Sequence, residues 1–307
     1  MIESRTRASR PTLCNGDLAS SLAAANASTY SSSRTVRNYM RSRKLFPAER
    51  AIIKRHPDNF AGSVLDVAIG AGRTTSVLTR LSRDYVGIDY SEPMVNAARR
   101  VLRPEAEPRS QLYTLDMRDI PDAFSRKRFD AILISYNGID YIPWESRNKL
   151  LRGLRPLLGD TGVLVFSTHD LSMREHERRF RVRDDLRIDA DLIRRQPLRA
   201  VSRLARLGPW LARVLPNRWR NRRLDRVFGD YAYVNDMGDN YGLVTTYVSR
   251  QAQIEQLVDF GYDQVDVLHP WLSHGYTAFN YFVCRPYRRE AARNRGATRR
   301  GAFGAPR

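Results

Sequence analysis

Short apolar runs alternate strictly with amphipathic helical patterns from residue 64 to residue 167. The runs have the length of strands, and their mostly apolar composition is typical of strands buried on both faces of a sheet. Strands that alternate with helices form a mostly parallel sheet, because each helix crosses back over the sheet before the next strand begins. We predict strands at 64–68, 85–89, 111–115, 131–135 and 162–167, and helices at 74–82, 92–101 and 147–158.

The alternation stops after Asp170 and resumes near Tyr247. Ser249 then fits the N-cap of a helix over 251–260, and two final strands follow at 264–268 and 279–284. The predicted fold class is α/β: a doubly wound, mostly parallel seven-stranded sheet with a basic insertion of helices and strands after strand five. We divide the chain into an N-terminal disordered segment and helical cap (1–45), a core (46–170), a basic insertion (171–244), the C-terminal part of the core (245–285) and a disordered basic tail (286–307).

The net charge of +19 is concentrated in three segments. Residues 1–44 carry +6, residues 174–226 carry +10 and residues 285–307 carry +7, so the remainder carries −4. A protein that binds nucleic acid over its whole surface spreads its basic residues more evenly. The charge pattern therefore assigns the basicity to appendages around a mildly acidic core.

Cysteine content and hydropathy exclude several other classes of protein. The two cysteines, Cys14 and Cys284, are too few for a disulfide framework or a Cys-rich zinc site. The sequence has no apolar run near the roughly 20 residues of a membrane span, and no continuous apolar stretch typical of a signal peptide. We expect a cytoplasmic protein. Because no tight cluster of His, Asp and Glu is present, we expect no metal site.

The turn after the first predicted strand carries the strongest functional signal. Small residues at Ala68, Gly70 and Gly72 let the backbone approach a ligand closely, and the next helix presents free N–H groups there. Asp89 ends the second strand, where a carboxylate accepts hydrogen bonds from the two hydroxyls of a ribose in nucleotide-binding sheets. Asp116 ends the third strand and is placed to accept from the exocyclic amine of an adenine.

These motifs resemble the class I S-adenosylmethionine-dependent methyltransferases, which have a Rossmann-like fold; the match is to the small-molecule type. The resemblance rests on VLDVAIGAG, YVGIDYSEPMVNAAR, LYTLDMRDIP and FDAILISYNGIDYI, and it covers about residues 48–170 and 247–285. It implies that S-adenosylmethionine is the cofactor. It further implies that the methionine part is held by Asp66, Ala68, Gly70 and Gly72, the ribose by Asp89 with Tyr90 beside it, and the adenine by Asp116 and Met117, with Ser135 near the cofactor.

One position departs from the family pattern, because the family usually has glycine where this chain has Ala68. A Cβ is accommodated there if the φ angle of that residue stays negative. The rival interpretation is a dinucleotide oxidoreductase, whose fingerprint Gly-x-Gly-x-x-Gly places glycine where this chain has Thr75. The three acidic strand ends favour the methyltransferase.

Methyl transfer requires the acceptor to be aligned, and a hydroxyl acceptor must lose a proton. Candidate residues follow strands four and five, at the edge where such sheets bind ligands. We predict His169 as the general base, because an unperturbed imidazole titrates near neutral pH. Tyr136 and Asp140 are the other catalytic candidates, and His269 and His274 are secondary ones.

The insertion at 171–244 is predicted to form a substrate lid, as the resemblance implies. Its apolar residues from Leu198 to Leu215 have helical spacing on either side of Gly208–Pro209, with arginines off this stripe, which predicts two short helices. A basic amphipathic pair lies on an anionic membrane through 192–228 or forms a half-buried lid with a solvated arginine face, and we favour the lid. Tyr231 to Asn235 and Tyr241 to Tyr247 alternate like strands and would line the substrate pocket.

The predicted reaction moves a methyl group to an O or N atom of a small-molecule or saccharide or glycolipid acceptor. One alternative is an RNA methyltransferase that uses the basic appendages; nucleic acid is the less favoured partner. The other is a non-catalytic scaffold with the same fold, associated peripherally with the inner membrane surface. The sequence gives no indication of oligomeric state.

Overall fold

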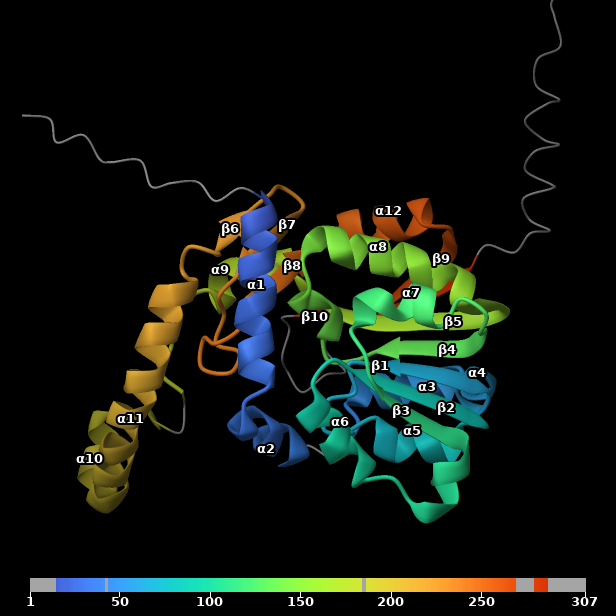
Figure 1. Cartoon of the computed structure of the whole chain (residues 1–307). Helices are drawn as coiled ribbons and strands as arrows, with labels where there is room; N and C mark the ends of the chain where they lie inside the picture. Colours follow the sequence, from blue (N-terminus) through green and yellow to red (C-terminus); the bar gives the residue numbers. More distant parts are fainter. Residues whose placement is uncertain (1–14, 42–43, 184–185, 269–278, 287–307) are drawn as a thin grey trace, which may run out of the picture.

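The computed structural model describes residues 15–41, 44–183, 186–268 and 279–286. The predicted basic tail and the two secondary candidates His269 and His274 fall outside these residues, apart from Pro286 at the start of the tail. Figure 1 shows one large sheet with an arm of two helices, α10 and α11, beside it.

The central sheet has the order β3-β2-β1-β4-β5-β10-β9. Strands β1 to β5 pair in parallel, whereas β10 lies antiparallel between β5 and β9. The doubly wound α/β class is therefore confirmed, and every strand predicted for it is present. The strands are β1 (Ser63–Val67), β2 (Asp84–Asp89), β3 (Ser110–Thr114), β4 (Phe129–Ile134), β5 (Leu158–Asp170), β9 (Tyr262–Leu268) and β10 (Phe279–Pro286).

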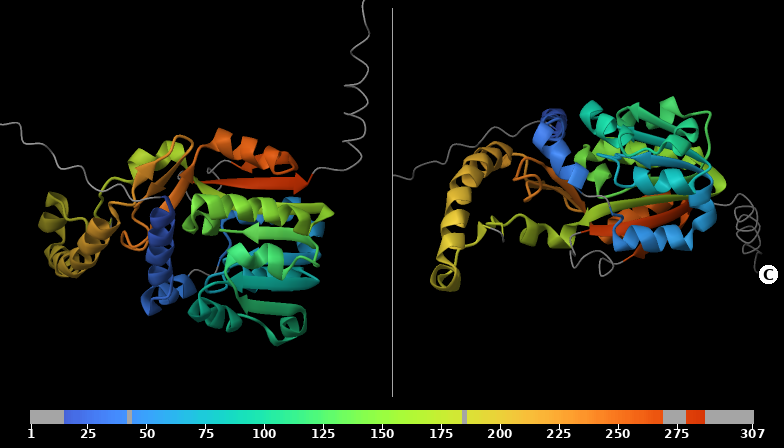
Figure 2. Two further views of the ribbon diagram at one scale, coloured as in Figure 1. Left: turned by 45° about the horizontal axis from the view of Figure 1, so that its top comes forward. Right: turned by 90° about the horizontal axis from the view of Figure 1, so that it is seen from below.

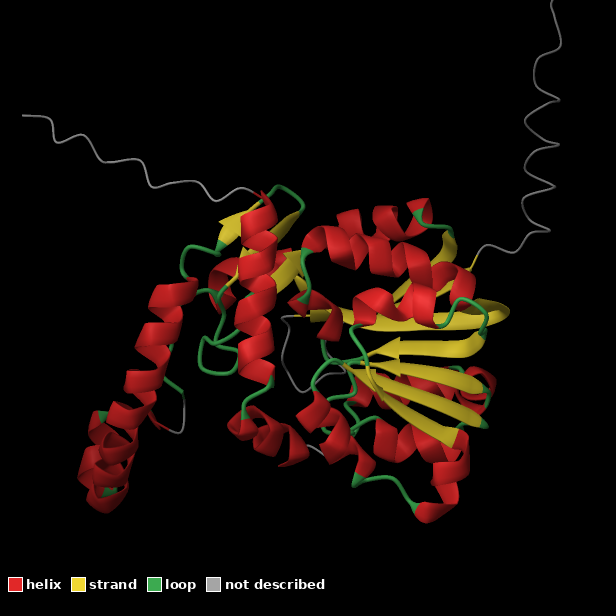
Figure 3. Ribbon diagram, in the orientation of Figure 1, coloured by secondary structure: helices red, strands yellow, loops and turns green. Residues whose placement is uncertain are grey.

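Helices cover both faces of this sheet, as Figure 3 shows. Successive side chains of a strand point to opposite faces, so Val64 joins one hydrophobic core while Leu65 and Val67 join the other. This division explains why the inner strands, such as β4, are mostly apolar. The helices of the core are α3 (Pro47–Arg55), α4 (Pro57–Ala61), α5 (Thr75–Leu81), α6 (Glu92–Arg99), α7 (Ile120–Ala123), α8 (Trp144–Leu154) and α12 (Arg250–Asp259), with the predicted cap Ser249 accepting from the N–H of Ala252. Short 3-10 turns lie at η1 (Pro104–Arg109), η2 (Met117–Asp119), η3 (Gly138–Tyr141), η4 (Arg155–Leu157) and η5 (Leu171–Met173).

Two N-terminal helices, α1 (Asn15–Tyr30) and α2 (Ser33–Arg41), lie across the carboxyl ends of the strands. Every fourth residue of α1 from Leu18 to Tyr30 is buried, the spacing of one helix face. At the centre of that face, the Asn26 amide donates to the carbonyls of Tyr141 (3.0 Å) and Val244 (2.9 Å) and accepts from the N–H of Val244. This amide fixes α1 to the edge of the sheet.

The insertion adds a small branch of strands and a helical arm. The C-terminal end of β5 pairs with β8, and β8 continues the branch to β7 and β6. Figure 2 shows the arm projecting from the side of the molecule. The elements are α9 (Arg174–Glu177), α10 (Ala190–Arg195), α11 (Pro197–Asn221), β6 (Arg226–Val227), β7 (Tyr231–Val234) and β8 (Thr245–Val248).

The prediction of two short helices broken at Gly208–Pro209 is wrong, because α11 is continuous through these residues. A proline inside a helix costs about 3 kcal/mol. The helix is held by packing instead: Trp210 and Val214 are buried against Tyr241. The helix contains two internal prolines, Pro209 and Pro216. Burial of two large apolar side chains recovers about 1.5–3 kcal/mol each, which offsets much of the cost of both prolines.

Candidate active site

The turn between β1 and α5 is built from residues with positive φ angles. Ala68, Gly70 and Gly72 have φ angles of 57°, 53° and 85°. A Cβ at Gly72 would lie 3.0 Å from the Cα of Ala98, so only glycine fits between this turn and α6. The condition of a negative φ angle at Ala68 is therefore not met. The tight turn forces this residue into the left-handed region, which costs an alanine about 1–2 kcal/mol.

Asp89 lies beside this turn at the end of β2 and is almost fully buried. Its Oδ2 accepts from the N–H of Gly70 and its Oδ1 from the N–H of Ser91, both at 2.9 Å. Burial raises the pKa of Asp89 to about 6, although these two N–H groups oppose the rise. Each oxygen accepts only one of these bonds, so the carboxylate retains acceptor capacity for a ligand in the adjoining cavity.

The third acidic residue, Asp116, follows β3 and caps a short 3-10 turn. Its carboxylate accepts from the backbone N–H of Arg118 and from the guanidinium of the same residue at 3.0 and 2.7 Å. Burial alone would raise the pKa of Asp116, but Arg118 outweighs it and holds this pKa below its usual range. Asp116 is therefore an anionic acceptor at neutral pH.

A cavity of about 550 Å³ joins these elements. Of the predicted cofactor residues, its lining includes Ala68, Gly70, Asp89, Tyr90, Asp116, Met117 and Ser135, and of the predicted catalytic residues it includes Tyr136. Helices α1 and α2 close one side of the cavity with Ala23, Ala24, Asn26, Ala27, Tyr30, Asn38 and Tyr39. Sequence reasoning described these helices as a cap but missed their part in the site, although the four-residue spacing of Leu18, Leu22 and Asn26 already marked a buried helix face.

Within the described chain, no residue of 171–244 lines this cavity. The structure therefore does not place the insertion as a lid over it. The physical reason is the anchoring of α11: Trp210 Nε1 donates to Asn240 Oδ1 at 3.1 Å, and Asn221 donates to the carbonyl of Tyr241 at 3.1 Å. These contacts hold the helix against the loop before β8. Tyr231 and Tyr233, which were expected to line the substrate pocket, pack with Phe228 instead.

Asp66 and Gly72 lie behind the cavity wall rather than in it. Asp66 Oδ2 accepts from the hydroxyls of Thr74 (2.6 Å) and Tyr85 (2.8 Å), and its Oδ1 is buried without a hydrogen-bond partner in the described chain. Burial raises the pKa of Asp66 to about 7, against the lowering effect of the two hydroxyls. Gly72 serves the packing of the turn on α6.

An ion pair that sequence reasoning missed also borders the cavity. The Arg73 guanidinium lines the cavity, donates to both carboxylate oxygens of the buried Glu49, and lies 4.3 Å from the centre of the Phe46 ring. Ser135 donates to the same carboxylate. The only sequence signal was an arginine directly after the glycine turn, and its partner on α3 is 24 residues away.

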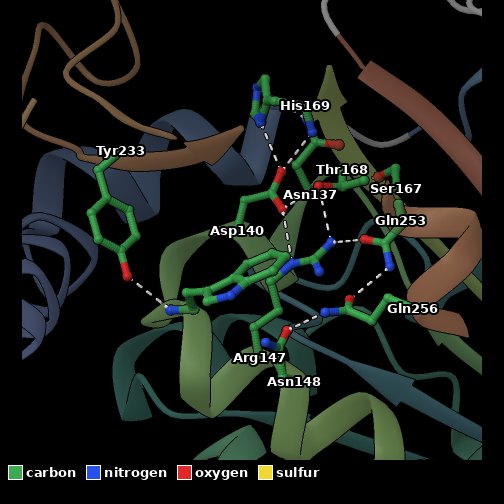
Figure 4. A network of polar contacts seen from close by, with 11 residues as sticks. Asn137, Asp140, Arg147, Asn148, Ser167, Thr168, His169, Tyr233, Gln253 and Gln256 are labelled. Atoms are coloured by element: carbon green, nitrogen blue, oxygen red, sulfur yellow. Dashed lines mark hydrogen bonds and ion pairs between the residues drawn. The ribbon is translucent and has the colours of Figure 1, made fainter. Parts of the chain in front are cut away.

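The predicted catalytic residues Asp140 and His169 contact each other, as Figure 4 shows, and neither belongs to the cavity lining. Tyr136 and Asn137 at the end of β4 have φ angles of 52° and 60°, a conformation that costs energy and is concentrated at functional sites. Asp140 is fully buried, and its Oδ2 lies 2.9 Å from Nδ1 of His169. On the other side of the ring, Nε2 lies 3.3 Å from the amide nitrogen of Asn137.

Asp140 is held by further contacts that fix its orientation. Oδ1 accepts from the Thr168 hydroxyl at 2.6 Å, Oδ2 accepts from the N–H of His169 at 2.8 Å, and the buried Arg147 guanidinium lies 3.7 Å from Oδ1. Burial would lower the pKa of His169, but the hydrogen bond and charge of Asp140 outweigh it and raise this pKa above its ordinary value. The pair therefore directs Nδ1–H toward Asp140 and leaves Nε2 as the basic nitrogen.

Comparison with known proteins finds methyltransferases. A family model described as a methyltransferase domain matches residues 64–162. The protein-L-isoaspartate O-methyltransferase of Burkholderia ambifaria is 28% identical over 166 residues, which cover 54% of this chain and 40% of the relative. The chain thus spans about two fifths of the length of that relative.

Solved structures show the same fold. An S-adenosylmethionine-dependent methyltransferase from Clostridium acetobutylicum matches with a TM-score of 0.50 and 13% identity, covering 76% of this chain and 89% of that one. The glycopeptide N-methyltransferase MtfA with bound S-adenosylhomocysteine matches with a TM-score of 0.50 and 16% identity, covering 79% of this chain and 90% of that one. Residues 64–162 match the methyltransferase-domain family, and the chain has the Rossmann-like fold of these solved methyltransferases.

Proposed function

We propose that this protein is an S-adenosylmethionine-dependent methyltransferase that methylates an O or N atom of a small-molecule acceptor. The observation that carries the proposal is the Asp89 carboxylate. It is buried in the wall of a cavity of about 550 Å³, next to the positive-φ turn at Gly70, and each of its oxygens accepts only one bond from the backbone. A buried carboxylate with acceptor capacity directed at a cavity fits the two hydroxyls of a ribose.

The remaining lining residues fit the rest of the cofactor. Asp116 would accept from the exocyclic amine of adenine, and Met117, which also lines the cavity, would contact the adenine ring. The resemblance assigns Asp66 to the methionine part, but Asp66 lies outside the lining, so we assign that part to the turn at Ala68 and Gly70 and to the Arg73 guanidinium on the wall. When bound, the cofactor supplies a methyl group already activated on a sulfonium.

His169 is the proposed general base, and Asp140 is the residue that positions it. An acceptor hydroxyl or ammonium must lose a proton, and Nε2 of His169 is the nitrogen that accepts it, because Nδ1–H is held by Asp140 at 2.9 Å. The step leaves an imidazolium that the adjacent carboxylate stabilises. Nε2 lies 3.3 Å from the Asn137 amide nitrogen, and neither His169 nor Asn137 lines the cavity, whereas the adjacent residue Tyr136 does. The proposed proton transfer therefore requires the acceptor to take the place of the Asn137 amide at Nε2.

The acceptor class follows from the aromatic side of the cavity. Tyr39, Phe46 and Tyr136 lie together in its lining, with 5.0 Å between the ring centres of Phe46 and Tyr136. Aromatic rings offer flat apolar faces to a sugar ring or another aromatic ring. This wall supports a small-molecule or saccharide-containing acceptor, the class that the resemblance also implies.

The test is transfer of a radioactive methyl group from S-adenosylmethionine to pooled phenols, sugars, glycolipids and amines by the full-length protein. We expect incorporation into at least one hydroxyl or amine pool. His169→Gln should bind S-adenosylhomocysteine like the parent and lose most of the transfer, about 10²–10⁴-fold. Unchanged transfer by His169→Gln would remove this histidine from the reaction. Incorporation into no pool, together with failure to bind S-adenosylhomocysteine, would refute the proposed function.

A further inference from the structure

The helical arm formed by α10 and α11 has one anchored side and one exposed side. On the anchored side, Trp210 and Val214 are buried against Tyr241. The N-terminal half of α11 extends beyond this anchor, and Figure 2 shows the arm standing out from the body of the molecule. The exposed side of α11 therefore meets solvent over its whole length.

That exposed side carries a second apolar stripe. Leu198 is 85% exposed and Trp219 is 68% exposed, and three further apolar side chains between them are more than half exposed. At about 100° per residue, the five fall within an arc of about 120° that excludes Trp210 and Val214. The five residues, which we name the apolar stripe, are Leu198, Val201, Leu204, Leu215 and Trp219.

The stripe lies beside a strongly basic surface. The sequence from Leu192 to Leu224 contains ten arginines and no Asp or Glu. Arg199, Arg213 and Arg220 are exposed, and their positions on the helix follow one edge of the apolar stripe. A long apolar patch of leucine and tryptophan bordered by arginine is typical of helices that lie in the interface of an anionic bilayer.

Charge and shape favour an anionic bilayer over the other surfaces that could cover the apolar stripe. No residue of α10 or α11 lines the described cavity, so the stripe does not face the methyl-transfer site. Pairing with a second copy would bring two runs of ten arginines together, which like-charge repulsion opposes. Nucleic acid would satisfy the arginines but leave the leucine and valine side chains without an apolar surface to contact.

We propose that α11 docks this protein in the plane of an anionic lipid bilayer, with the apolar stripe inserted among the acyl chains and the flanking arginines at the headgroups. In the described residues, no helix has the length and apolar character needed to cross a bilayer. The contact is therefore an in-plane one, reversible by salt. It does not depend on the proposed methyl transfer.

Sedimentation of the full-length protein with vesicles tests the docking. We expect binding to vesicles of phosphatidylcholine with phosphatidylglycerol, and weak binding to phosphatidylcholine alone. The triple variant Leu198→Ser, Val201→Ser, Leu204→Ser keeps every charge of the chain, including the basic residues at 285–307, and should bind roughly tenfold or more weakly. The matched control Val258→Ser, on α12, also replaces an exposed apolar side chain and should bind like the parent.

Trp219 reports the depth of insertion directly. Brominated lipid should quench part of the tryptophan fluorescence of the parent, and Trp219→Phe, which stays apolar, should still sediment but lose that quenching. Equal vesicle binding by the parent and the triple variant would overturn the proposal. Failure of the parent to sediment with anionic vesicles would overturn it as well. If the parent is a dimer and the triple variant is a monomer, the apolar stripe is a dimer interface instead. If the parent binds RNA and the triple variant loses that binding to the same extent, the stripe belongs to an RNA-binding surface instead.

Discussion

Replacement of Asp89 by asparagine tests the ribose site with little change in shape. The carboxylate accepts from two backbone donors, Gly70 and Ser91, and retains one lone pair on each oxygen for the cofactor. Asparagine has one acceptor oxygen, and its NH₂ group would face one of the two N–H groups. The variant therefore loses charge-assisted acceptor capacity toward the cavity.

The size of the effect follows from hydrogen-bond energies and from the pKa of this carboxyl. Loss of a charge-assisted bond costs about 1.5–3 kcal/mol, which corresponds to binding weakened by about ten- to a hundredfold. Because burial raises the pKa of Asp89 to about 6, the carboxyl becomes protonated as the pH falls through 6 and accepts weakly. The dissociation constant of the parent should then rise, toward tenfold per pH unit below 6.

The assay is isothermal titration with S-adenosylhomocysteine between pH 5 and pH 8. The parent should bind best at pH 7–8 and lose affinity below pH 6, whereas Asp89→Asn should be weaker at pH 8 and nearly independent of pH. Asp84→Asn, at the opposite end of β2 and outside the cavity lining, is the matched control and should behave like the parent. A parent affinity that is flat from pH 5 to pH 8, or an Asp89→Asn variant that binds like the parent, would refute the reasoning.

Three further predictions concern strain, a buried charge and the base. Ala68→Gly should raise the melting temperature because glycine tolerates the positive φ angle, with a gain of up to about 1 kcal/mol after the entropy cost of glycine. The control Ala71→Gly should lower the melting temperature. A loss of stability in both variants would contradict the strain at Ala68. The pKa of Asp66, about 7 against 3.8 unfolded, means that the native carboxyl holds its proton more tightly, so stability falls as the pH rises from 4 to 7. A pKa shift of about 3 units, at 1.36 kcal/mol each, makes this fall about 4 kcal/mol. Denaturant unfolding of Asp66→Asn should show no such fall. A parent whose free energy of unfolding rises from pH 4 to pH 7 would exclude the effect. Because Asp140 raises the pKa of His169, the kcat of the parent should rise with pH through a value above 6.5, and Asp140→Asn should lower both kcat and that apparent pKa; an unshifted profile would contradict the pairing.

The sheet was predictable because each of its strands can be recognised from a short stretch of sequence. The apolar runs ending at Val67, Asp89 and Ile134 have the length of buried strands, and parallel pairing sets their carboxyl ends side by side without further information. Asp89, the last residue of β2, and Asp116, which follows β3, therefore fall at one edge of the sheet. Asp89 and Asp116 reached the cavity wall for this reason.

The features of the site and fold that the sequence did not predict depend on contacts between residues far apart in the chain. The pairing of Arg73 with Glu49 and the docking of Asn26 on Val244 join residues 24 and 218 positions apart, and neither residue type signals its partner. The positive φ angle of Ala68 is imposed by the tight turn after β1, and alanine by itself disfavours this conformation. The continuity of α11 through Pro209 depends on the burial of Trp210, a tertiary contact that overrides helix propensity.

The most direct test of the central claim is the binding of S-adenosylmethionine and, separately, of NADH to the full-length protein at pH 8 by isothermal titration. The cavity at Gly70, Asp89 and Asp116 should bind one S-adenosylmethionine per chain and should show no heat with NADH. Binding of NADH that Asp89→Asn weakens would assign the cavity to a dinucleotide, and the absence of binding by either ligand would contradict the methyltransferase proposal.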